Sequence, residues 1–236
     1  MENLYGIGSK LAEKIRKELI SRGEIEENKT YTEKEIRGIL KKSAIFKDLP
    51  TSTQMDLKYN PSRKIPYELI YFMNKELKKI WKGIKFEIAG SFIRKKPFSS
   101  DIDIVVIGNW DDLQKRINLK SKILRALDPF EKGKYIVGTL FLIAIPPQLR
   151  EIFKLKKVIA IKVDLFFTTE DEYIFARLFA VGSGKFNIIM RTLAKRNGYL
   201  LNQHGLFKNG KKVRIKNERE IFEKIGKTYR EPQDRN

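Results

Sequence analysis

Two aspartates at the start of a short apolar run constrain this chain more than any other feature. Asp101 and Asp103 are separated by Ile102, and residues 104–107 that follow are all apolar. In an extended strand alternate side chains point to opposite faces, so the two carboxylates project together while Ile102 faces a core. Mg²⁺ prefers oxygen ligands and is often held by one or two carboxylates, phosphates and water. The run therefore predicts a strand that begins at a metal site.

An Asp-x-Asp pair also suits an ordinary solvated sheet face, but other residues favour the metal site. Asp164 lies within the β-rich apolar segment 162–167, where an unpaired buried charge would be costly. A neighbouring strand could place this third carboxylate beside the first pair, and three carboxylates suit two divalent ions. Upstream, a triphosphate could be bound by the backbone N–H groups, hydroxyl and guanidinium of Gly90, Ser91 and Arg94.

The charge balance indicates a polyanionic partner. The 236 residues include 49 lysines and arginines against 29 acidic residues, which gives a net charge of +20. Such a field favours nucleic acid; an anionic membrane surface and plain solubility are the other interpretations. No apolar run approaches the roughly 20 residues of a spanning helix, and the N-terminus has no signal-peptide pattern. We expect an intracellular monomer that does not associate with membranes.

The cysteine and histidine counts exclude whole classes of chemistry. The chain contains no cysteine and a single histidine, His204. Disulfide frameworks, thiolate zinc sites, histidine-rich metal clusters and histidine-based triads are therefore excluded. Any catalysis must depend on carboxylates, lysines and hydroxyls.

Hydrophobic periodicity predicts an α+β chain that is first helical, then mixed, then mostly helical. Helices are expected over residues 9–22, 33–42, 66–82 and 111–127, and strands over 85–89, 102–108, 135–145 and 157–167. The Asn209-Gly210 pair predicts the turn of a hairpin within residues 205–215. This pattern suggests four regions, at 1–32, 33–83, 84–168 and 169–236.

These motifs resemble those of the family X DNA polymerases, the group of DNA polymerase β. In that family a Gly-Ser pair and an arginine precede an Asp-x-Asp pair, a third aspartate follows on a later strand, and a second Gly-Ser turn opens a helix. The matching residues here are Gly90, Ser91, Arg94, Asp101, Asp103, Asp164, Gly182, Ser183, Asn187 and Arg191. Residues 201–209 and 228–232 are similar to the end of a compact viral member of the family.

The resemblance implies both a fold and an activity. It implies a helical DNA-binding region at 33–83, a nucleotidyltransferase palm with a mixed β-sheet at 84–168, and a nucleotide-selecting subdomain at 169–236. The implied activity is template-directed DNA synthesis on gapped or primer-template DNA from deoxynucleoside triphosphates, as in the gap filling of base excision repair. If the chain is viral, we expect it in the host cytoplasm, a viral factory or the virion.

The resemblance also implies roles for single residues. Two Mg²⁺ ions, or Mn²⁺, would be held by Asp101, Asp103 and Asp164. The incoming nucleotide would be bound by Gly90, Ser91, Arg94, Ser100, Phe179, Gly182, Ser183, Asn187 and Arg191. Contacts to DNA are expected from Lys162, which replaces an arginine of the family, and from His204.

Gly6, Gly8 and Lys10 form a second motif, at the N-terminus. Glycines permit a tight turn before a helix, whose free N–H groups and nearby lysine can contact a DNA phosphate, although simple helix capping would explain them equally well. The stretch resembles a helix-hairpin-helix element in a lyase-like region at 1–32. There Lys14 takes the place of the family's 5′-deoxyribose-phosphate lyase nucleophile. We expect this end mainly to bind phosphate.

Two other functions are compatible with the sequence. A template-independent or small-acceptor nucleotidyltransferase could use the same aspartates, and an inactive DNA-binding module could share the positive charge. The first needs neither the charge of +20 nor the N-terminal glycine motif. The second has no use for three spaced carboxylates, so the templated enzyme is favoured.

Overall fold

The computed structural model describes residues 1, 4 and 6–235, which fold as two compact units. The first is Met1–Pro61 and the second is Ser62–Asn236. Residues on both sides of position 32 share one core, and the helix that follows position 66 packs into the second unit. The four regions suggested by the sequence stay a prediction.

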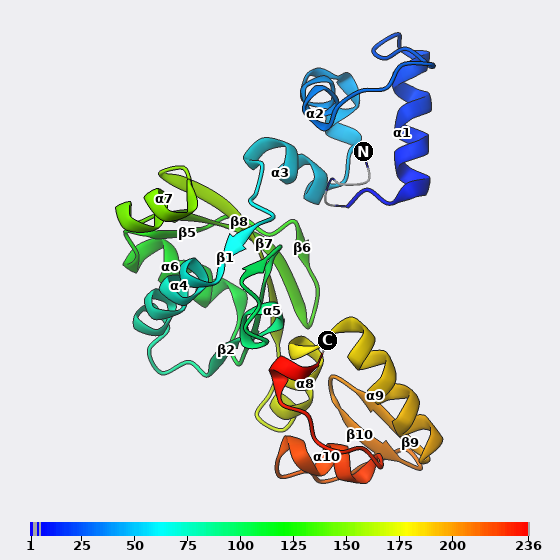
Figure 1. Ribbon diagram of the computed structural model, residues 1–236, viewed down its shortest axis with the longest axis vertical. Helices are drawn as coiled ribbons and strands as arrows, with labels where there is room; N and C mark the ends of the chain where they lie inside the picture. The colour runs from blue at the N-terminus through cyan, green and yellow to red at the C-terminus, as the bar shows by residue number, and fades with distance from the viewer. Residues whose placement is uncertain (2–3, 5, 236) are drawn as a thin grey trace. The chain divides into compact units, whose positions relative to one another are not determined.

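The first unit is entirely helical (Figure 1). It contains α1 (Ser9–Ser21), α2 (Glu33–Lys42), the 3₁₀ helix η1 (Ala44–Asp48) and α3 (Thr51–Tyr59). Leu19, Leu40 and Leu57, one from each α-helix, are fully buried together. Arg37 of α2 donates to a carboxylate oxygen of the buried Asp56 at 3.0 Å, which ties α2 to α3.

The second unit is built on a six-stranded mixed sheet. Its strands are β2 (Phe86–Ile88), β4 (Ile102–Val106), β5 (Leu124–Ala126), β6 (Glu131–Lys132), β7 (Ile136–Ala144) and β8 (Val158–Phe167). Their order is β2-β4-β8-β7-β5, with β6 also paired to β7. The β4–β8 pair is parallel and the other pairs are antiparallel. The mixed sheet confirms the predicted α+β class.

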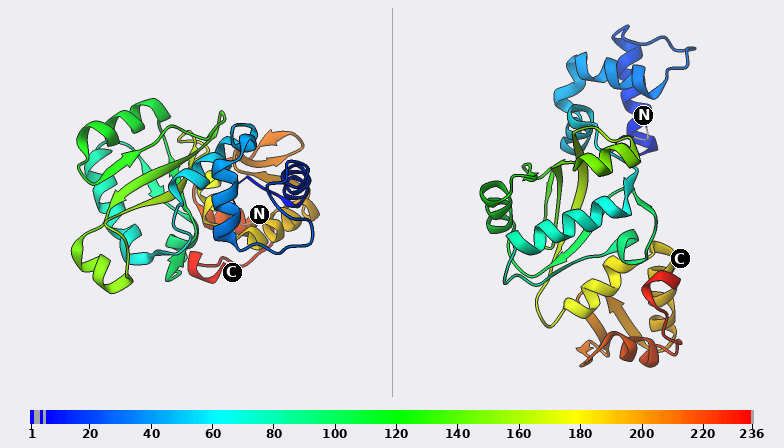
Figure 2. Two further views of the ribbon diagram at one scale, coloured as in Figure 1. Left: turned by 90° about the horizontal axis from the view of Figure 1, so that it is seen from above. Right: turned by 60° about the vertical axis from the view of Figure 1, so that its left-hand side comes forward.

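Helices cover both faces of this sheet (Figure 2). On one face α4 (Tyr67–Ile80) and α6 (Trp110–Lys120) share a large core with Ile102, Ile104 and Val106 of β4. On the other, Val105 packs with Ala176 of α8 (Tyr173–Val181) and with the segment that leads into α5 (Gly90–Ile93). A separate two-stranded antiparallel sheet is formed by β1 (Ile65–Pro66) and β3 (Phe98–Ser99). The short α7 (Pro147–Phe153) packs Leu149 against the large core.

One expected helix ends early. A helix over 111–127 was predicted, but α6 stops at Lys120 and residues 124–126 form β5. The hydroxyl of Ser121 accepts hydrogen bonds from the N–H groups of Ile123 and Leu124, at 3.1 and 2.9 Å. These bonds turn the chain, and β5 then pairs with the edge of β7. The prediction was wrong here because strand pairing overrides local helical periodicity.

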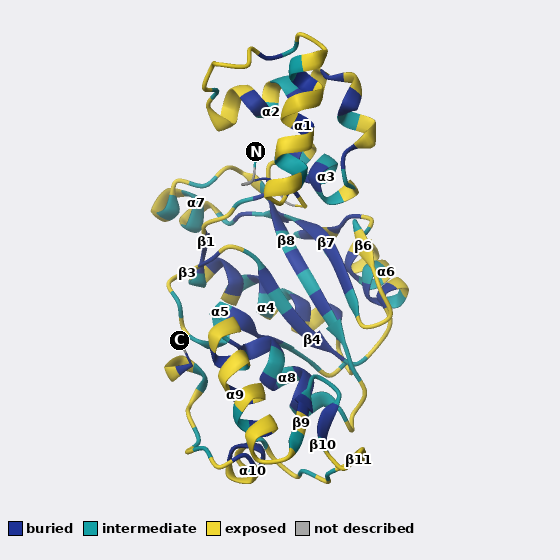
Figure 3. Ribbon diagram, turned by 90° about the vertical axis from the view of Figure 1, so that its right-hand side faces the viewer, coloured by how far each residue is buried: buried dark blue, intermediate teal, exposed yellow. Residues whose placement is uncertain are grey.

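The C-terminal part of the second unit has its own small sheet. After α8 come α9 (Gly184–Arg196), β9 (Tyr199–Asn202), β10 (Gly205–Lys208), β11 (Lys211–Lys212), α10 (Glu218–Lys224) and the 3₁₀ helix η2 (Pro232–Asp234). The predicted hairpin is confirmed, since Asn209 and Gly210 have φ values of 51° and 75° between β10 and β11. Figure 3 shows exposed positions along α9 and buried ones on the strands beside it.

None of the described helices combines the length and the apolarity that crossing a membrane requires.

Two glycines of the first unit should respond oppositely to alanine. Gly6 has φ +80°, and an added Cβ would lie 2.2 Å from the hydroxyl oxygen of Ser52. Gly38 lies inside α2, and nothing approaches within 4 Å of its Cβ position. Gly6→Ala should therefore destabilise the protein by about 1 to 2 kcal/mol, whereas Gly38→Ala should stabilise it by about 0.5 to 1 kcal/mol. Urea unfolding of both variants would measure the two signs, and equal effects would contradict this packing of Gly6.

Candidate nucleotidyl-transfer site

Two of the predicted carboxylates lie directly opposite each other in the sheet. In the parallel pairing of β4 with β8, Asp103 and Asp164 are register partners. Neighbouring strands lie about 4.8 Å apart, and partners in register point to the same face. The pairing therefore places both side chains on the face that α8 partly covers, while Ile102 and Ile104 enter the opposite core.

The electrostatics of this pair are unfavourable without a cation. Burial, followed by repulsion from Asp101 and Asp164, raises the pKa of Asp103 to about 7. Burial also raises the pKa of Asp164, against the opposing effect of Lys162. The Lys162 ammonium donates to Asp164 Oδ2 at 2.7 Å, and the Asp164 side chain is only 14% exposed. Two partly buried carboxylates thus lie close together, and the nearby cations Lys162 and Arg94 offset only part of the cost of burial and repulsion at Asp103.

Two glycines make room for the carboxylates. Gly90 has φ +57°, and a Cβ at this position would lie 2.2 Å from Asp103 Oδ2. Gly138 on β7 is the register partner of Asp164, and a Cβ there would lie 2.6 Å from the Phe130 ring and 3.3 Å from Asp164 Oδ1. Any larger residue would collide with Asp103 at the first position and with Phe130 at the second. Sequence reasoning selected Gly90 but missed Gly138, although an isolated glycine inside a strand pattern is a recognised sign of close approach.

The remaining predicted phosphate-binding residues surround this end of β4. Asp101 precedes the strand and is partly buried; the Ser100 hydroxyl donates to its Oδ1 at 3.1 Å. The Ser91 hydroxyl donates to the hydroxyl of the buried Ser99. Local hydrogen bonds therefore orient both hydroxyls beside the carboxylates.

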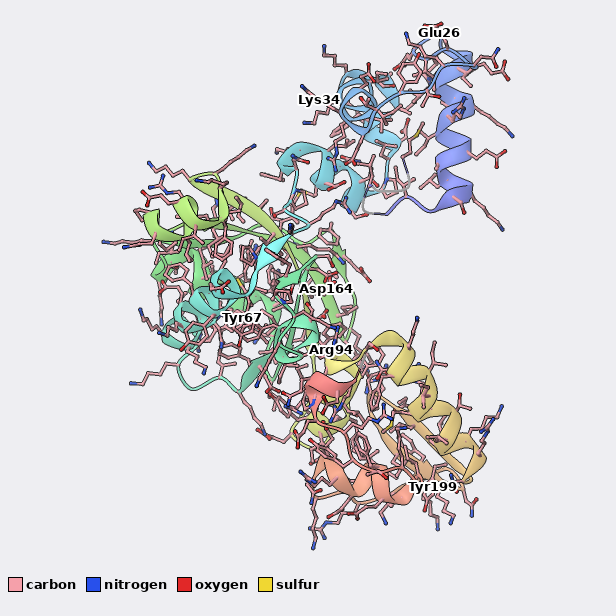
Figure 4. The ribbon with its side chains drawn as sticks, in the orientation of Figure 1. Glu26, Lys34, Tyr67, Arg94, Asp164 and Tyr199 are labelled. Atoms are coloured by element: carbon pink, nitrogen blue, oxygen red, sulfur yellow. The ribbon has the colours of Figure 1, made fainter. Side chains whose placement is uncertain are left out.

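Arg94 joins the sheet layer to the C-terminal part (Figure 4). Its guanidinium donates to the backbone carbonyl of Val181, at the end of α8. Its Nε is buried and has no hydrogen-bond partner among the described residues. Burial lowers the pKa of Arg94, while the nearby Asp103 carboxylate opposes this shift. A guanidinium held beside the carboxylate cluster is suited to bind an anionic oxygen through its accessible N–H groups.

The second Gly-Ser turn begins α9. The Ser183 hydroxyl accepts from the N–H of Phe186 at 3.3 Å, and Gly182 lies against Arg94. From α9, Asn187 donates to the Phe179 carbonyl at 2.8 Å, and the Arg191 guanidinium lies 5.3 Å from the centre of the Phe179 ring. The structure therefore brings these three predicted nucleotide-binding residues together.

The two predicted DNA contacts of this unit have protein partners. Lys162 pairs with Asp164, as described above. His204 Nδ1 lies 2.9 Å from Glu172 Oε2, and its ring packs edge-on against Tyr135, with 4.6 Å between ring centres. These contacts connect the β9–β10 turn to β7 and account for His204 structurally; its contact to DNA stays a prediction.

The candidate residues of the first unit lie on and before α1. Gly6 and Gly8 precede the helix, with Gly8 at its N-cap. Lys10 and Lys14 are exposed on it. Glu13 forms an exposed ion pair with Lys17 at 2.9 Å, so this face carries both signs of charge.

The donor set at the β4–β8 pair fits a hard divalent cation. Its ligands would be carboxylate oxygens of Asp101, Asp103 and Asp164, which suit Mg²⁺ or Mn²⁺. Within residues 1, 4 and 6–235, no three acidic or histidine side chains are arranged to hold one ion. Instead Asp164 bonds to Lys162. Burial and the neighbouring carboxylates raise the pKa of Asp103, and a bound cation would act in the opposite direction.

A mixed sheet with paired aspartates on adjacent strands, a Gly-Ser turn and a partly buried arginine is typical of a nucleotidyltransferase palm. Comparison with family models agrees. Residues 72–173 match the nucleotidyltransferase domain, and residues 176–236 match the DNA polymerase beta thumb. Over residues 72–236 the chain is thus similar to the DNA polymerase β-like proteins of family X, whose members generally use divalent metal ions.

Individual relatives share only part of their length with this chain. DNA polymerase IV of Saccharomyces cerevisiae is 40% identical over 75 residues, 32% of this chain and 13% of that protein. Repair DNA polymerase X of African swine fever virus is 38% identical over 76 residues, 31% of this chain and 44% of that protein. The matches thus span less than half the length of either relative.

Solved structures share the fold over nearly the whole chain. The ternary gap complex of Leishmania infantum polymerase beta superimposes with a TM-score of 0.77 at 22% identity, covering 99% of this chain and 87% of that one. The ternary P/T complex of the same polymerase gives 0.75 at 20% identity, covering 99% and 95%. At this identity the likeness establishes the fold.

The Asp103 pKa makes the stability of the metal-free protein depend on pH. In the unfolded chain this carboxyl titrates near its ordinary 3.8, but in the folded protein near 7. Between these values the unfolded state releases a proton that the folded state retains, so stability falls as pH rises. Asp103→Asn removes this titration and should be more stable than the parent above pH 7 by roughly 2 to 4 kcal/mol. At a pH below about 4 the two proteins should be equally stable.

Thermal unfolding in the presence of a chelator, at a series of pH values, measures this difference. Asp111→Asn, on the exposed start of α6, is the matched control and should follow the parent. A pH-independent difference between Asp103→Asn and the parent would contradict the burial of a shared charge.

Proposed function

We propose that this protein is a template-directed DNA polymerase that adds deoxynucleotides to a primer 3′-OH and fills short gaps. The observation that carries the proposal is the register pairing of Asp103 with Asp164, beside the Gly90 turn and Arg94. The names of the relatives support it, since they are a repair DNA polymerase and DNA polymerase IV. The solved structures with this fold are polymerase complexes with gapped DNA and with a primer-template.

The residues of the palm are suited to an in-line displacement at phosphorus. Asp164 would accept the proton of the primer hydroxyl, whose oxygen forms a bond to the α-phosphorus while the bond to pyrophosphate breaks. In the metal-free protein burial raises the pKa of this carboxyl, which favours acceptance of a proton. Two Mg²⁺ ions, or Mn²⁺, held by Asp101, Asp103 and Asp164 would activate the hydroxyl and neutralise the triphosphate.

The residues around the carboxylates would orient the nucleotide. Ser91, Ser100 and Arg94, with the backbone at Gly90, would bind the triphosphate oxygens, because their hydroxyls and guanidinium lie at the same end of β4. Phe179, Asn187 and Arg191 would contact the sugar and the new base pair. The Ala180 side chain is only 8% exposed and packs toward Val105, so Phe179 is the aromatic ring available to the nucleotide.

For the first unit we propose phosphate binding. Lys10 and Lys14 are exposed cations on α1. Exposed positive charge is sufficient for electrostatic attraction to the DNA phosphates. A lysine that forms a Schiff base must have a neutral amine, which requires either burial away from water or neighbouring positive charge. The hollow beside Lys14 is lined by Lys10 and Lys17 and also by Glu13 and Glu18, so the neighbouring positive charge is offset. Lys14 itself is exposed and therefore not desolvated.

The assignment of Asp164 can be tested by primer extension. Asp164→Ala should lower the chemical step by several orders of magnitude, because it removes a metal ligand and the base. Its affinity for gapped DNA should change little. Asp171→Ala, an exposed aspartate before α8, is the control and should extend primers normally. Activity of more than about a tenth of the parent in Asp164→Ala would refute the assignment.

The substrate distinguishes this proposal from its rivals. A templated polymerase extends a primer opposite a one-nucleotide gap with the complementary nucleotide only. Equal extension of single-stranded DNA with every nucleotide would identify a template-independent transferase. DNA binding without incorporation would identify an inactive DNA-binding module.

The role of the first unit predicts a change in salt dependence. Lys10→Ala should weaken binding to gapped DNA and reduce the slope of log affinity against log salt by about 0.9. Borohydride trapping on a 5′-deoxyribose-phosphate substrate should give little covalent adduct. A strong adduct that Lys14→Ala abolishes would instead establish a lyase.

A further inference from the structure

A cavity of about 390 Å³ lies within the second unit, where the large sheet meets the C-terminal part. The start of β7, the end of β8, α8 and the turn between β9 and β10 each contribute to its wall. Figure 3 shows α8 between the large sheet and the strands β9 and β10. Pockets that bind small molecules have volumes of about 300 to 1,000 Å³ and mostly apolar walls with a few polar groups.

Two pairs of aromatic rings form much of this wall. The rings of Phe166 and Phe179 meet edge to face, with 6.0 Å between their centres. The rings of Tyr135 and His204 form a second edge-on pair, with 4.6 Å between centres. Aromatic side chains attract other flat rings by offset stacking and by edge contacts. The wall therefore favours a flat ligand over a branched aliphatic one.

One carboxylate oxygen on the wall is available for a further hydrogen bond. Glu172 Oε2 lies 2.9 Å from His204 Nδ1. Glu172 Oε1 has no hydrogen-bond partner within the part of the chain that the structure describes, and the side chain is 24% exposed. A carboxylate forms stronger hydrogen bonds than a neutral acceptor. An N–H donor on a ligand would thus be bound firmly at this point.

The charges around the cavity favour a ligand without net charge. The Lys134 ammonium lies 5.0 Å from the centre of the Tyr135 ring, and both residues line the cavity. Lys134 and the net charge of +20 would repel a cation, whereas Glu172 would repel an anion. A neutral ring that carries an N–H donor avoids both costs.

We infer that this cavity binds a neutral, planar heteroaromatic amine, the class to which free nucleobases belong. The ring of the ligand packs against the aromatic wall, and its amine donates to Glu172 Oε1. The cavity borders the proposed nucleotide site, since Phe179 lies in its wall, but the described residues that line it include neither Asn187 nor Arg191. It is therefore a second site, and the inference does not depend on the proposed polymerase activity.

2-Aminopurine provides a direct test, because it is flat, neutral near neutral pH, and loses fluorescence when it stacks on aromatic rings. Titration with the full chain, without DNA or nucleotide, should give saturable quenching. The dissociation constant should be on the order of 0.1 to 1 mM, as suits so small a ligand. 2-(Dimethylamino)purine lacks the exocyclic N–H donors and should bind about tenfold more weakly.

Two cavity variants and two matched controls locate the binding. Glu172→Gln should abolish the preference for 2-aminopurine over its dimethyl analogue, because it removes the anionic acceptor. Tyr135→Ala should weaken the binding of both purines about tenfold, because it removes a ring from the wall. Glu170→Gln and Tyr71→Ala change exposed residues of the same types outside the cavity and should bind like the parent. Circular dichroism should show the same fold in all four variants.

Three outcomes would overturn the inference. The first is the absence of saturable quenching by the parent, and the second is equal binding of both purines by the parent and both cavity variants. The third is displacement of 2-aminopurine by deoxythymidine triphosphate, which would place the purine in the proposed nucleotide site. Primer extension is measured separately, so each of these results leaves the proposed polymerase activity intact.

Discussion

The site depends on the parallel pairing of β4 with β8. These strands are far apart in the sequence, and only their register places Asp103 beside Asp164. Because parallel strands need a crossover connection, α6, β5, β6, β7 and α7 all lie between the two strands in the chain. The large core under α4 and α6 therefore stabilises an arrangement that the two carboxylates oppose. A site that binds cations must hold like charges together, and the palm does this with buried leucine, isoleucine and valine.

The C-terminal part is connected to this sheet by charged side chains that are largely removed from water. Arg177 of α8 bonds to Glu87 of β2 and to Glu218 of α10. The fully buried Arg235 also bonds to Glu218, and its carbonyl accepts from the N–H of Ser183 at 3.0 Å. Breaking one member of such a network leaves the others buried and unpaired, which is costly. This network and the Arg94 bond to Val181 therefore position the start of α9 relative to the carboxylates.

Sequence patterns predicted the features that neighbouring residues determine, and they missed the features that depend on residues brought together by folding. The helix at 33–42 begins at a local capping box of Thr32 with Glu35, and the hairpin turn at Asn209 and Gly210 requires only positive φ values. Both were predicted because neighbouring residues determine them. The end of α6 was not, since β5 forms only when the edge of β7 is present to pair with it. Gly138 and Arg235 were missed because the groups that surround them come together only in the folded chain. Gly138 lies against the Phe130 ring and Asp164, and the Arg235 guanidinium lies near the rings of Phe186, Phe222 and Tyr229.

By itself the sequence determined the chemistry available to this protein. Its carboxylates and its lack of cysteine favour oxygen ligands at any active site, and its net charge of +20 favours a polyanionic partner, because composition and local spacing set charge and ligand type. Only the tertiary structure decided which groups meet. It placed Asp103 against Gly90 and paired Lys162 with Asp164. It also brought the His204 ring to the Glu172 carboxylate and formed the cavity that both residues line. Contacts of this kind depend on strand register and on burial, which arise from the whole fold and which no short stretch of residues contains.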